Sequence, residues 1–137
     1  MKKSNLQFSN PVLTRLEFEI HKSFKADGPI EMPINIKREI VRNADGDVPI
    51  NMAQVAVTLS VGNKDSSTPF YIEADEEAKF KWNEGMFNEV QIEDLLKLNA
   101  TALLLSYLRP VISNITSSSP YPAYNLPYLD LTANEEE

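Results

Sequence analysis

Residue types that commonly support catalysis or crosslinking are scarce in this 137-residue chain. It has no cysteine, a single histidine (His21) and only four glycines. The lack of cysteine excludes disulfide bonds, thiolate metal sites and cysteine nucleophiles, and neither a glycine-rich phosphate-binding loop nor a nucleophile elbow is present. His21 has no partner at the spacing of a catalytic triad or a zinc site, so we expect an exposed strand histidine. The sequence therefore predicts no enzyme and no metal or other cofactor.

Positive charge is also scarce, with 13 Lys and Arg against 20 Asp and Glu and a net charge of −7. The cations are scattered, which leaves no basic surface for nucleic acid or for an anionic membrane. Residues 1–7 contain two lysines with no apolar run behind them, unlike a signal peptide. Polar residues interrupt the most apolar segment at Asn99, Thr101, Ser106 and Arg109, so we expect no membrane span. We predict a soluble cytoplasmic protein without nucleic-acid or membrane partners.

Two groups of acidic and amide side chains resemble cation ligands only superficially. Glu73, Asp75 and Glu77 alternate along a predicted strand and lack the glycine and loop spacing of a calcium-binding loop. Residues 43–47 include three side chains of the calcium-binding type but no closing glutamate, and we interpret them as a tight turn. A solvated acidic face is the better interpretation.

Four segments alternate apolar and polar residues with the period of a half-buried strand, namely 16–24, 34–40, 55–61 and 70–82. Glu76 alone breaks the alternation of the fourth segment. Turn residues separate the segments, as at Asp27-Gly28-Pro29 and Gly62-Asn63. Residues 1–11 are expected to be a loose lead-in and residues 132–137 a disordered acidic tail. With 42% hydrophobic residues, residues 1–137 are expected to form one domain with one core.

Residues 92–118 repeat apolar side chains at helical spacing around nearly the whole helix. One stripe holds Leu96, Leu103, Leu104, Tyr107, Leu108, Val111 and Ile115, and the other side holds Leu95, Leu98, Ala102 and Leu105. A surface helix needs a single stripe. We therefore expect one face against the sheet and the other against another subunit. Pro110 predicts a kink over 106–109, or alternatively the end of the helix.

Four antiparallel strands followed by one long helix predict an α+β fold, with a four-stranded antiparallel sheet that carries the helix on one face. The opposite face of the sheet is expected to meet water through Glu17, Glu19, Lys37, Glu39, Lys79 and Lys81. The segment 121–131 is more apolar and aromatic than a free tail. This surplus of apolar surface indicates self-association or capture of apolar segments of other chains.

The run 104–116 (LLSYLRPVISNIT), followed by Pro120, Pro122 and Asn125-Leu126-Pro127, resembles the SecB family of export chaperones and SecB-like proteins. The segments 23–26 and 70–73 fit as well, so the resemblance extends from Leu16 to Leu131. It implies subunits that pair through the first strand and the long helix, and a tetramer built as a dimer of dimers. It also implies an ATP-independent holdase whose surface grooves bury apolar segments of unfolded polypeptides.

The resemblance also implies the site residues. The polypeptide-binding groove would comprise Phe24, Tyr107, Tyr121, Tyr124, Leu126 and Tyr128. The oligomer interface, in a dimer or a tetramer, would comprise Leu16, Phe18, Leu98, Ala102, Leu105 and Ile112.

Two departures from the family pattern keep the interpretation open. The chain ends soon after Leu131, where the export chaperones continue into another helix and a tail that engages the translocase motor, so coupling to that motor is doubtful. The loop 25–33 is also shorter than the family's crossover loop. The alternatives are a holdase, which would include one for protein export or for a toxin–antitoxin system, and a SecB-fold structural or adaptor protein that binds itself or one dedicated partner.

Overall fold

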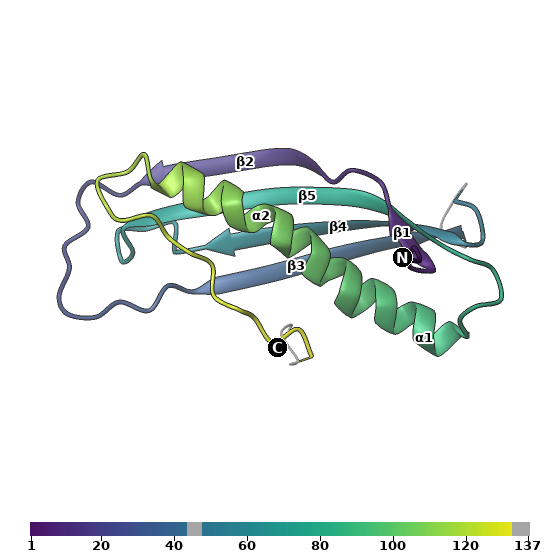
Figure 1. The fold of residues 1–137 in the computed structure, drawn as a ribbon. Coiled ribbons are helices and arrows are strands. Elements are labelled where there is room, and N and C mark those ends of the chain that lie inside the picture. Colours follow the sequence, from purple (N-terminus) through teal and green to yellow (C-terminus); the bar gives the residue numbers. More distant parts are fainter. Residues whose placement is uncertain (44–47, 133–137) are drawn as a thin grey trace.

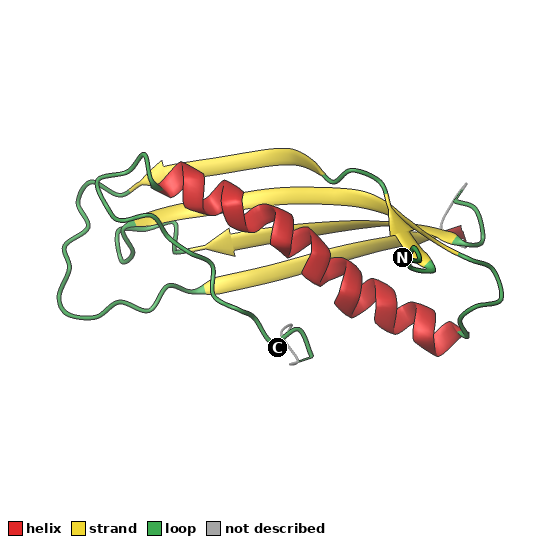
Figure 2. Cartoon of the chain, viewed as in Figure 1, coloured by secondary structure: helices red, strands yellow, loops and turns green. Residues whose placement is uncertain are grey.

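A single helical layer lies across one face of an antiparallel sheet (Figures 1 and 2). The computed structural model describes residues 1–43 and 48–132. The strands are β1 (Leu6–Phe8), β2 (Val12–Ile20), β3 (Ile34–Arg42), β4 (Met52–Val61) and β5 (Phe70–Trp82). One continuous helix follows, composed of α1 (Glu89–Asp94), the π-helical segment η2 (Leu95–Ala100) and α2 (Thr101–Thr116). The predicted α+β architecture is confirmed.

The longest strand, β5, lies between β4 on one side and both β1 and β2 on the other, and β3 completes the sheet beyond β4. The four predicted strands are all present. The expectation of a loose lead-in was wrong for residues 6–8, which form β1 and pair with residues 80–82. Leu6 and Phe8 lie opposite Trp82 and Phe80, so both face the core side of β5. This strand satisfies a stretch of β5 backbone that β2 does not reach.

The two faces of the sheet differ as the alternation predicts. Val55, Val57, Leu59 and Val61 of β4 are fully buried toward the helix, and the charged side chains expected on the other face are exposed. Residues 44–47, part of the predicted turn, lie outside the described residues, as do residues 133–137 of the predicted tail.

The helix starts at a capping box. The Asn88 side chain accepts a hydrogen bond from the Gln91 backbone at 2.8 Å, and the Gln91 side chain accepts one from the Asn88 backbone at 2.9 Å. The helix continues past Pro110 to Thr116, so the alternative that it ends at the proline was wrong.

The helix buries every fourth residue, namely Ile92, Leu96, Ala100, Leu104, Leu108, Ile112 and Thr116. In an ideal α-helix a spacing of four drifts by about 40° at each step, because a turn takes 3.6 residues. The wider turns of η2, at Leu95–Ala100, compensate part of this drift. The predicted stripe assumed an ideal helix and therefore missed Ala100 and Ile112.

By length and composition alone, Glu89–Thr116 could cross a membrane, so the expectation that no segment meets this criterion was wrong. The polar residues that interrupt it are too few to lower its apolar character. Here the same helix covers the sheet, as the core helix of a soluble protein does.

Candidate polypeptide-binding site

The chain reverses direction after α2 and returns beside the helix as an extended segment (Figure 1). We call residues 120–132 the strap. The reversal is built from serines: the backbone N–H groups of Ser117, Ser118 and Ser119 donate to carbonyls of the last helical turn at 3.0–3.2 Å. The run of small, polar residues therefore closes the helix and directs the strap back along it.

Two side chains of α2 anchor the first half of the strap. Thr116 Oγ1 donates to the Ile112 carbonyl at 2.8 Å and accepts from the Tyr124 backbone N–H at 2.7 Å. Arg109 donates from Nε to the Leu126 carbonyl at 3.4 Å and from Nη2 to the Pro127 carbonyl at 3.2 Å. Its guanidinium also lies over the Tyr128 ring, 5.8 Å from the centroid.

Three of the six residues expected in the groove lie at the end of the sheet where β2 ends and β5 begins, in two separate ring pairs. The Phe24 and Tyr121 rings pack edge to face at 6.2 Å, and Tyr124 packs in the same way on Phe70 at 5.9 Å. Leu126 is buried and belongs to the hydrophobic core, so it holds the strap in place instead of lining a groove. Burial raises the pKa of the Tyr124 hydroxyl.

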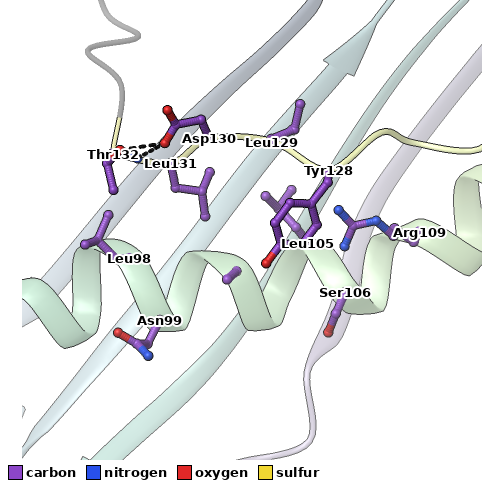
Figure 3. A pocket seen from close by; sticks show the side chains of 11 residues that line it. Leu98, Asn99, Leu105, Ser106, Arg109, Tyr128, Leu129, Asp130, Leu131 and Thr132 are labelled. Atoms are coloured by element: carbon purple, nitrogen blue, oxygen red, sulfur yellow. Dashed lines mark hydrogen bonds between the residues drawn. The ribbon is translucent and has the colours of Figure 1, made fainter.

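The other two aromatic residues lie apart from this cluster. Tyr128 is 95% exposed and lies beside Arg109 (Figure 3). Tyr107 lies on the β1 side of the helix, with its ring 6.4 Å from that of Phe8. The structure therefore pairs Phe24 with Tyr121 and packs Tyr124 on Phe70, while Tyr107 lies elsewhere. A function in polypeptide binding stays a prediction for all of them.

A cavity of about 660 Å³ lies between the helix and the end of the strap (Figure 3). Its walls are Leu98, Asn99, Ala102, Leu105, Ser106 and Arg109 of the helix, and residues 128–132 of the strap. A smaller hollow of about 150 Å³ lies between residues 34–36 of β3 and residues 129–131. Leu129, Asp130 and Leu131 thus line two hollows, one facing the helix and one facing β3.

Leu129, Leu131 and Arg109 were not predicted as residues of the candidate site. The apolar composition of 121–131 indicated the strap, and the alternation Leu129-Asp130-Leu131 could have indicated an extended segment on an apolar surface. The contacts of Arg109 had no such signal, because its hydrogen-bond partners are backbone carbonyls.

The residues expected at an oligomer interface are dispersed. Leu16 is exposed, Phe18 is half-buried with its ring 6.0 Å from Phe70, and Leu98 and Ala102 line the larger cavity. Leu105 and Ile112 are only 2% and 0% exposed. Contrary to expectation, the chain itself buries these two side chains. Ile112 belongs to the buried four-residue series, and Leu105 follows Leu104 of that series and joins the core beside the strap.

Exposed apolar side chains instead gather where β1 and β2 border the helix. Phe8 and Tyr107 are both 42% exposed and touch each other, and Leu13 and Leu16 are also exposed. Leu13 and Leu16 lie opposite Glu76 and Ala74, so they share the helix-bearing face of the sheet with Phe8. We call Phe8, Leu13, Leu16 and Tyr107 the edge patch. In the described part of the chain, the outer side of β2 pairs with no strand.

The opposite face of the sheet carries an ion cluster on β2 and β5. Arg15 Nε donates to Asp75 at 3.0 Å, and its Nη atoms bind Glu17 and Glu73. The Tyr71 hydroxyl donates to Glu73, which lowers the pKa of Glu73 and raises the pKa of Tyr71 to about 12. The described residues contain no group of acidic or histidine side chains that could hold a metal ion. This cluster stabilises the sheet and lies on the face away from the strap.

His21 is buried, so the expectation of an exposed histidine was wrong. Its Nδ1 lies 2.8 Å from the Thr68 carbonyl, because the loop between β4 and β5 folds over the end of β2. Its Nε2 lies 4.0 Å from the exposed Glu19 carboxylate.

No family model matches the chain. It is 27% identical over 140 residues to the uncharacterized protein MJ0357 of Methanocaldococcus jannaschii. The alignment covers 98% of this chain and 87% of that protein. Among solved structures it is similar to the SecB-like chaperone Rv1957 of Mycobacterium tuberculosis in complex with a ChAD peptide from the Rv1956 HigA1 antitoxin. The TM-score is 0.69, with 15% identity and 90% of each chain covered. The fold is SecB-like.

A protein of unknown function from Streptococcus agalactiae aligns with a TM-score of 0.49 and 11% identity, over 90% of this chain and 97% of that one.

Proposed function

We propose that this chain is a SecB-like chaperone that binds extended, apolar segments of other polypeptides without ATP. One observation carries the proposal: an apolar cavity of about 660 Å³ beside α2 whose second wall is an extended chain segment. The SecB-like fold supports it, since the similar Rv1957 protein was solved with an antitoxin peptide. A cytoplasmic location is a part of the proposal that rests on the sequence alone, and coupling to an export motor is not proposed.

The chemistry of the cavity suits a partner with little sequence specificity. Leu98 and Ala102 offer aliphatic surface, which binds apolar side chains in proportion to the area removed from water. Asn99 and Ser106 border this surface and can exchange hydrogen bonds with a bound backbone. The aromatic rings of Phe24 and Tyr121 extend the apolar surface toward the other end of the strap.

We also propose that two copies associate through the edge patch. An unpaired strand edge presents backbone groups that a second strand can bind, and β2 offers this edge beside Leu13, Leu16 and Tyr107. A two-fold pairing of β2 with β2 would bury the patch of both copies at once.

The test is whether the purified chain, without nucleotide, suppresses aggregation of an unrelated unfolded protein at stoichiometric concentration. Ala102→Glu places a charge in the cavity from an exposed position, and Asn114→Glu places the same charge on the same helix outside it. We expect the first variant to lose suppression and the second to retain it, with the mass of both unchanged by light scattering. Equal suppression by both variants would exclude the cavity as the binding site.

The alternative is a SecB-fold adaptor for one dedicated partner. It is favoured by the fact that the peptide in the Rv1957 structure comes from a single antitoxin. A chain that does not suppress aggregation of any of several unrelated proteins, although intact in mass, would support the adaptor.

A further inference from the structure

We propose that the outer edge of β3 binds an extended, acidic segment of another polypeptide, which adds a strand to the sheet and pairs its carboxylates with Lys37, Lys64 and Lys97. This site shares no lining residue with the cavity beside the strap. It therefore goes beyond the proposed function, and it can be tested independently of the apolar cavity.

A cavity of about 840 Å³ lies along β3 and reaches both faces of the sheet. Neighbouring residues of a strand point to opposite faces, and four consecutive residues of β3, 35–38, line this cavity. Ile36 packs against the core on the helix side, whereas Asn35 and Lys37 are exposed on the other side. Since β4 occupies the inner edge of β3, a cavity that meets both faces passes around the outer edge.

This outer edge is suited to an added strand. In the part of the chain that the structure describes, β3 pairs only with β4 and forms the border of the sheet (Figure 1). A hollow, and no strand pairing, lies between residues 34–36 and residues 129–131 of the strap. Residues 35–37 therefore present backbone groups that an extended polypeptide can bind as a further strand.

The cavity carries a surplus of positive charge in a chain whose net charge is −7. Its lining includes Lys37 of β3, Lys64 of the loop between β4 and β5, and Lys97 of the helix, all exposed. Among the described residues none of these lysines forms an ion pair, and Lys64 Nζ lies 5.7 Å from the centroid of the Tyr71 ring. Arg38 also lines the cavity but is already engaged within the chain. The three lysines thus supply the positive charge that a ligand meets.

Glu73 is the single carboxylate among the described residues of the lining, and it does not neutralise these lysines. It accepts a hydrogen bond from the Tyr71 hydroxyl and binds Arg15, and both interactions lower its pKa. Thr58 and Ser60 of β4 add hydroxyl groups that can donate to a further carboxylate. The lining therefore favours an anionic ligand.

The positions of the lysines indicate which anionic polypeptide fits. Lys97 belongs to the helical layer, whereas Lys37 lies on the polar face of the sheet and Lys64 lies over Tyr71 on that same face. The side chains of an added strand alternate between these two faces. A carboxylate therefore meets a lysine on either face, and a run of consecutive aspartate or glutamate residues matches the site.

Fluorescence anisotropy of a labelled octaglutamate peptide, at low ionic strength and with the full chain, tests the charges. We expect Lys37→Glu, Lys64→Glu and Lys97→Glu each to weaken binding about fivefold. Lys79→Glu is the matched control, because it makes the same change of charge at an exposed position of β5 outside the cavity, and it should retain most of the affinity. Equal weakening by all four variants, or no binding to the unaltered chain, would overturn the site.

Two further ligands test the added strand and the class of partner. Octaglutamate with methylated backbone nitrogens keeps every carboxylate but cannot donate backbone hydrogen bonds, so we expect about tenfold weaker binding. Equal affinity for the two peptides would overturn the strand addition. An oligonucleotide with eight phosphates that binds as tightly as octaglutamate would overturn the acidic polypeptide as the partner.

One variant separates this site from the proposed function. Ala102→Glu alters the cavity beside the strap, which the acidic peptide does not use, so octaglutamate should bind it as it binds the unaltered chain. Loss of octaglutamate binding in this variant would place the peptide in the apolar cavity and overturn the inference.

Discussion

Glu76 is a carboxyl group in the core, and its removal should stabilise the protein at neutral pH. Its side chain lies on the helix-bearing face of β5, between the apolar Val57 of β4 and Leu13 of β2. It is only 3% exposed, and its Oε1 has no hydrogen-bond partner. Burial raises the pKa of Glu76 above its ordinary value of 4.5.

The direction of the pH dependence follows from this raised pKa. Below about pH 4 the folded and unfolded states both hold the proton, so Glu76 adds no pH dependence. As the pH rises above 4.5 the unfolded state releases its proton while the folded state retains it, and the folded state loses stability. The loss continues until the pH passes the raised pKa and is constant beyond it.

Two substitutions separate the effect of the Glu76 charge on stability from the effect of its unsatisfied hydrogen-bonding capacity. Glu76→Gln should have the same free energy of unfolding as the parent near pH 4 and a higher one at pH 8, because the amide does not ionise. Glu76→Met should also remove the unpartnered Oε1 and gain about 1–3 kcal/mol of unfolding free energy at pH 8, which corresponds to about 4 °C in Tm for each kcal/mol.

Urea unfolding of the parent and of both variants, at several pH values from 4 to 8, measures these differences. Groups whose pKa values are lowered, such as Glu73 and Asp65, affect all three chains alike and cancel in the comparison. Glu77→Gln is the control, since Glu77 is the next residue of β5 and lies on the polar face beside Gln54. If Glu76→Gln is no more stable than the parent at pH 8, the carboxylate is solvated or paired in solution and the reasoning fails.

Three further predictions concern the helix. Ile112→Ala should lower the free energy of unfolding by about 2–5 kcal/mol in urea titrations, since the side chain is fully buried, and a surface position would cost far less. Arg109→Ala should release the strap, seen as faster backbone hydrogen exchange at residues 124–128 with β4 unchanged. Tyr107→Asp should dissociate the proposed dimer in light scattering without unfolding the chain; an unchanged mass would exclude the edge patch as the interface.

The sheet was largely predictable because its strands are half-buried. Val55, Val57, Leu59 and Val61 alternate with polar residues, and a strand with one wet face must show this pattern. β1 escaped prediction because three residues are too few to define a period. β2 was located only from Leu16 onward, since the bulge between Leu13 and Arg15 breaks the alternation before it.

The side of the helix that is buried and the contacts of the strap were harder to predict. The π-helical segment shifts the buried face, and no local residue pattern marked it, so Ile112 was assigned to the wrong side. In the alternating pattern of residues 16–24, His21 falls on the polar side, which predicted an exposed side chain. The loop that carries Thr68, 47 residues away in the sequence, contacts it and buries it. Aromatic composition located the strap, whereas the backbone hydrogen bonds that position it depend on tertiary structure.

The apolar surplus of the helix has an explanation within the single chain. A helix that is apolar on all sides predicts a second subunit against its outer face, but here the strap covers one flank and lines a cavity with Leu98 and Ala102. The other flank, with Tyr107, borders β1 through Phe8. The apolar surface left for a second copy is therefore the edge patch beside β2, while the surface under the strap is left for a polypeptide. If both proposals hold, the two sites lie on opposite flanks of one helix, and a polypeptide can enter without separating the subunits.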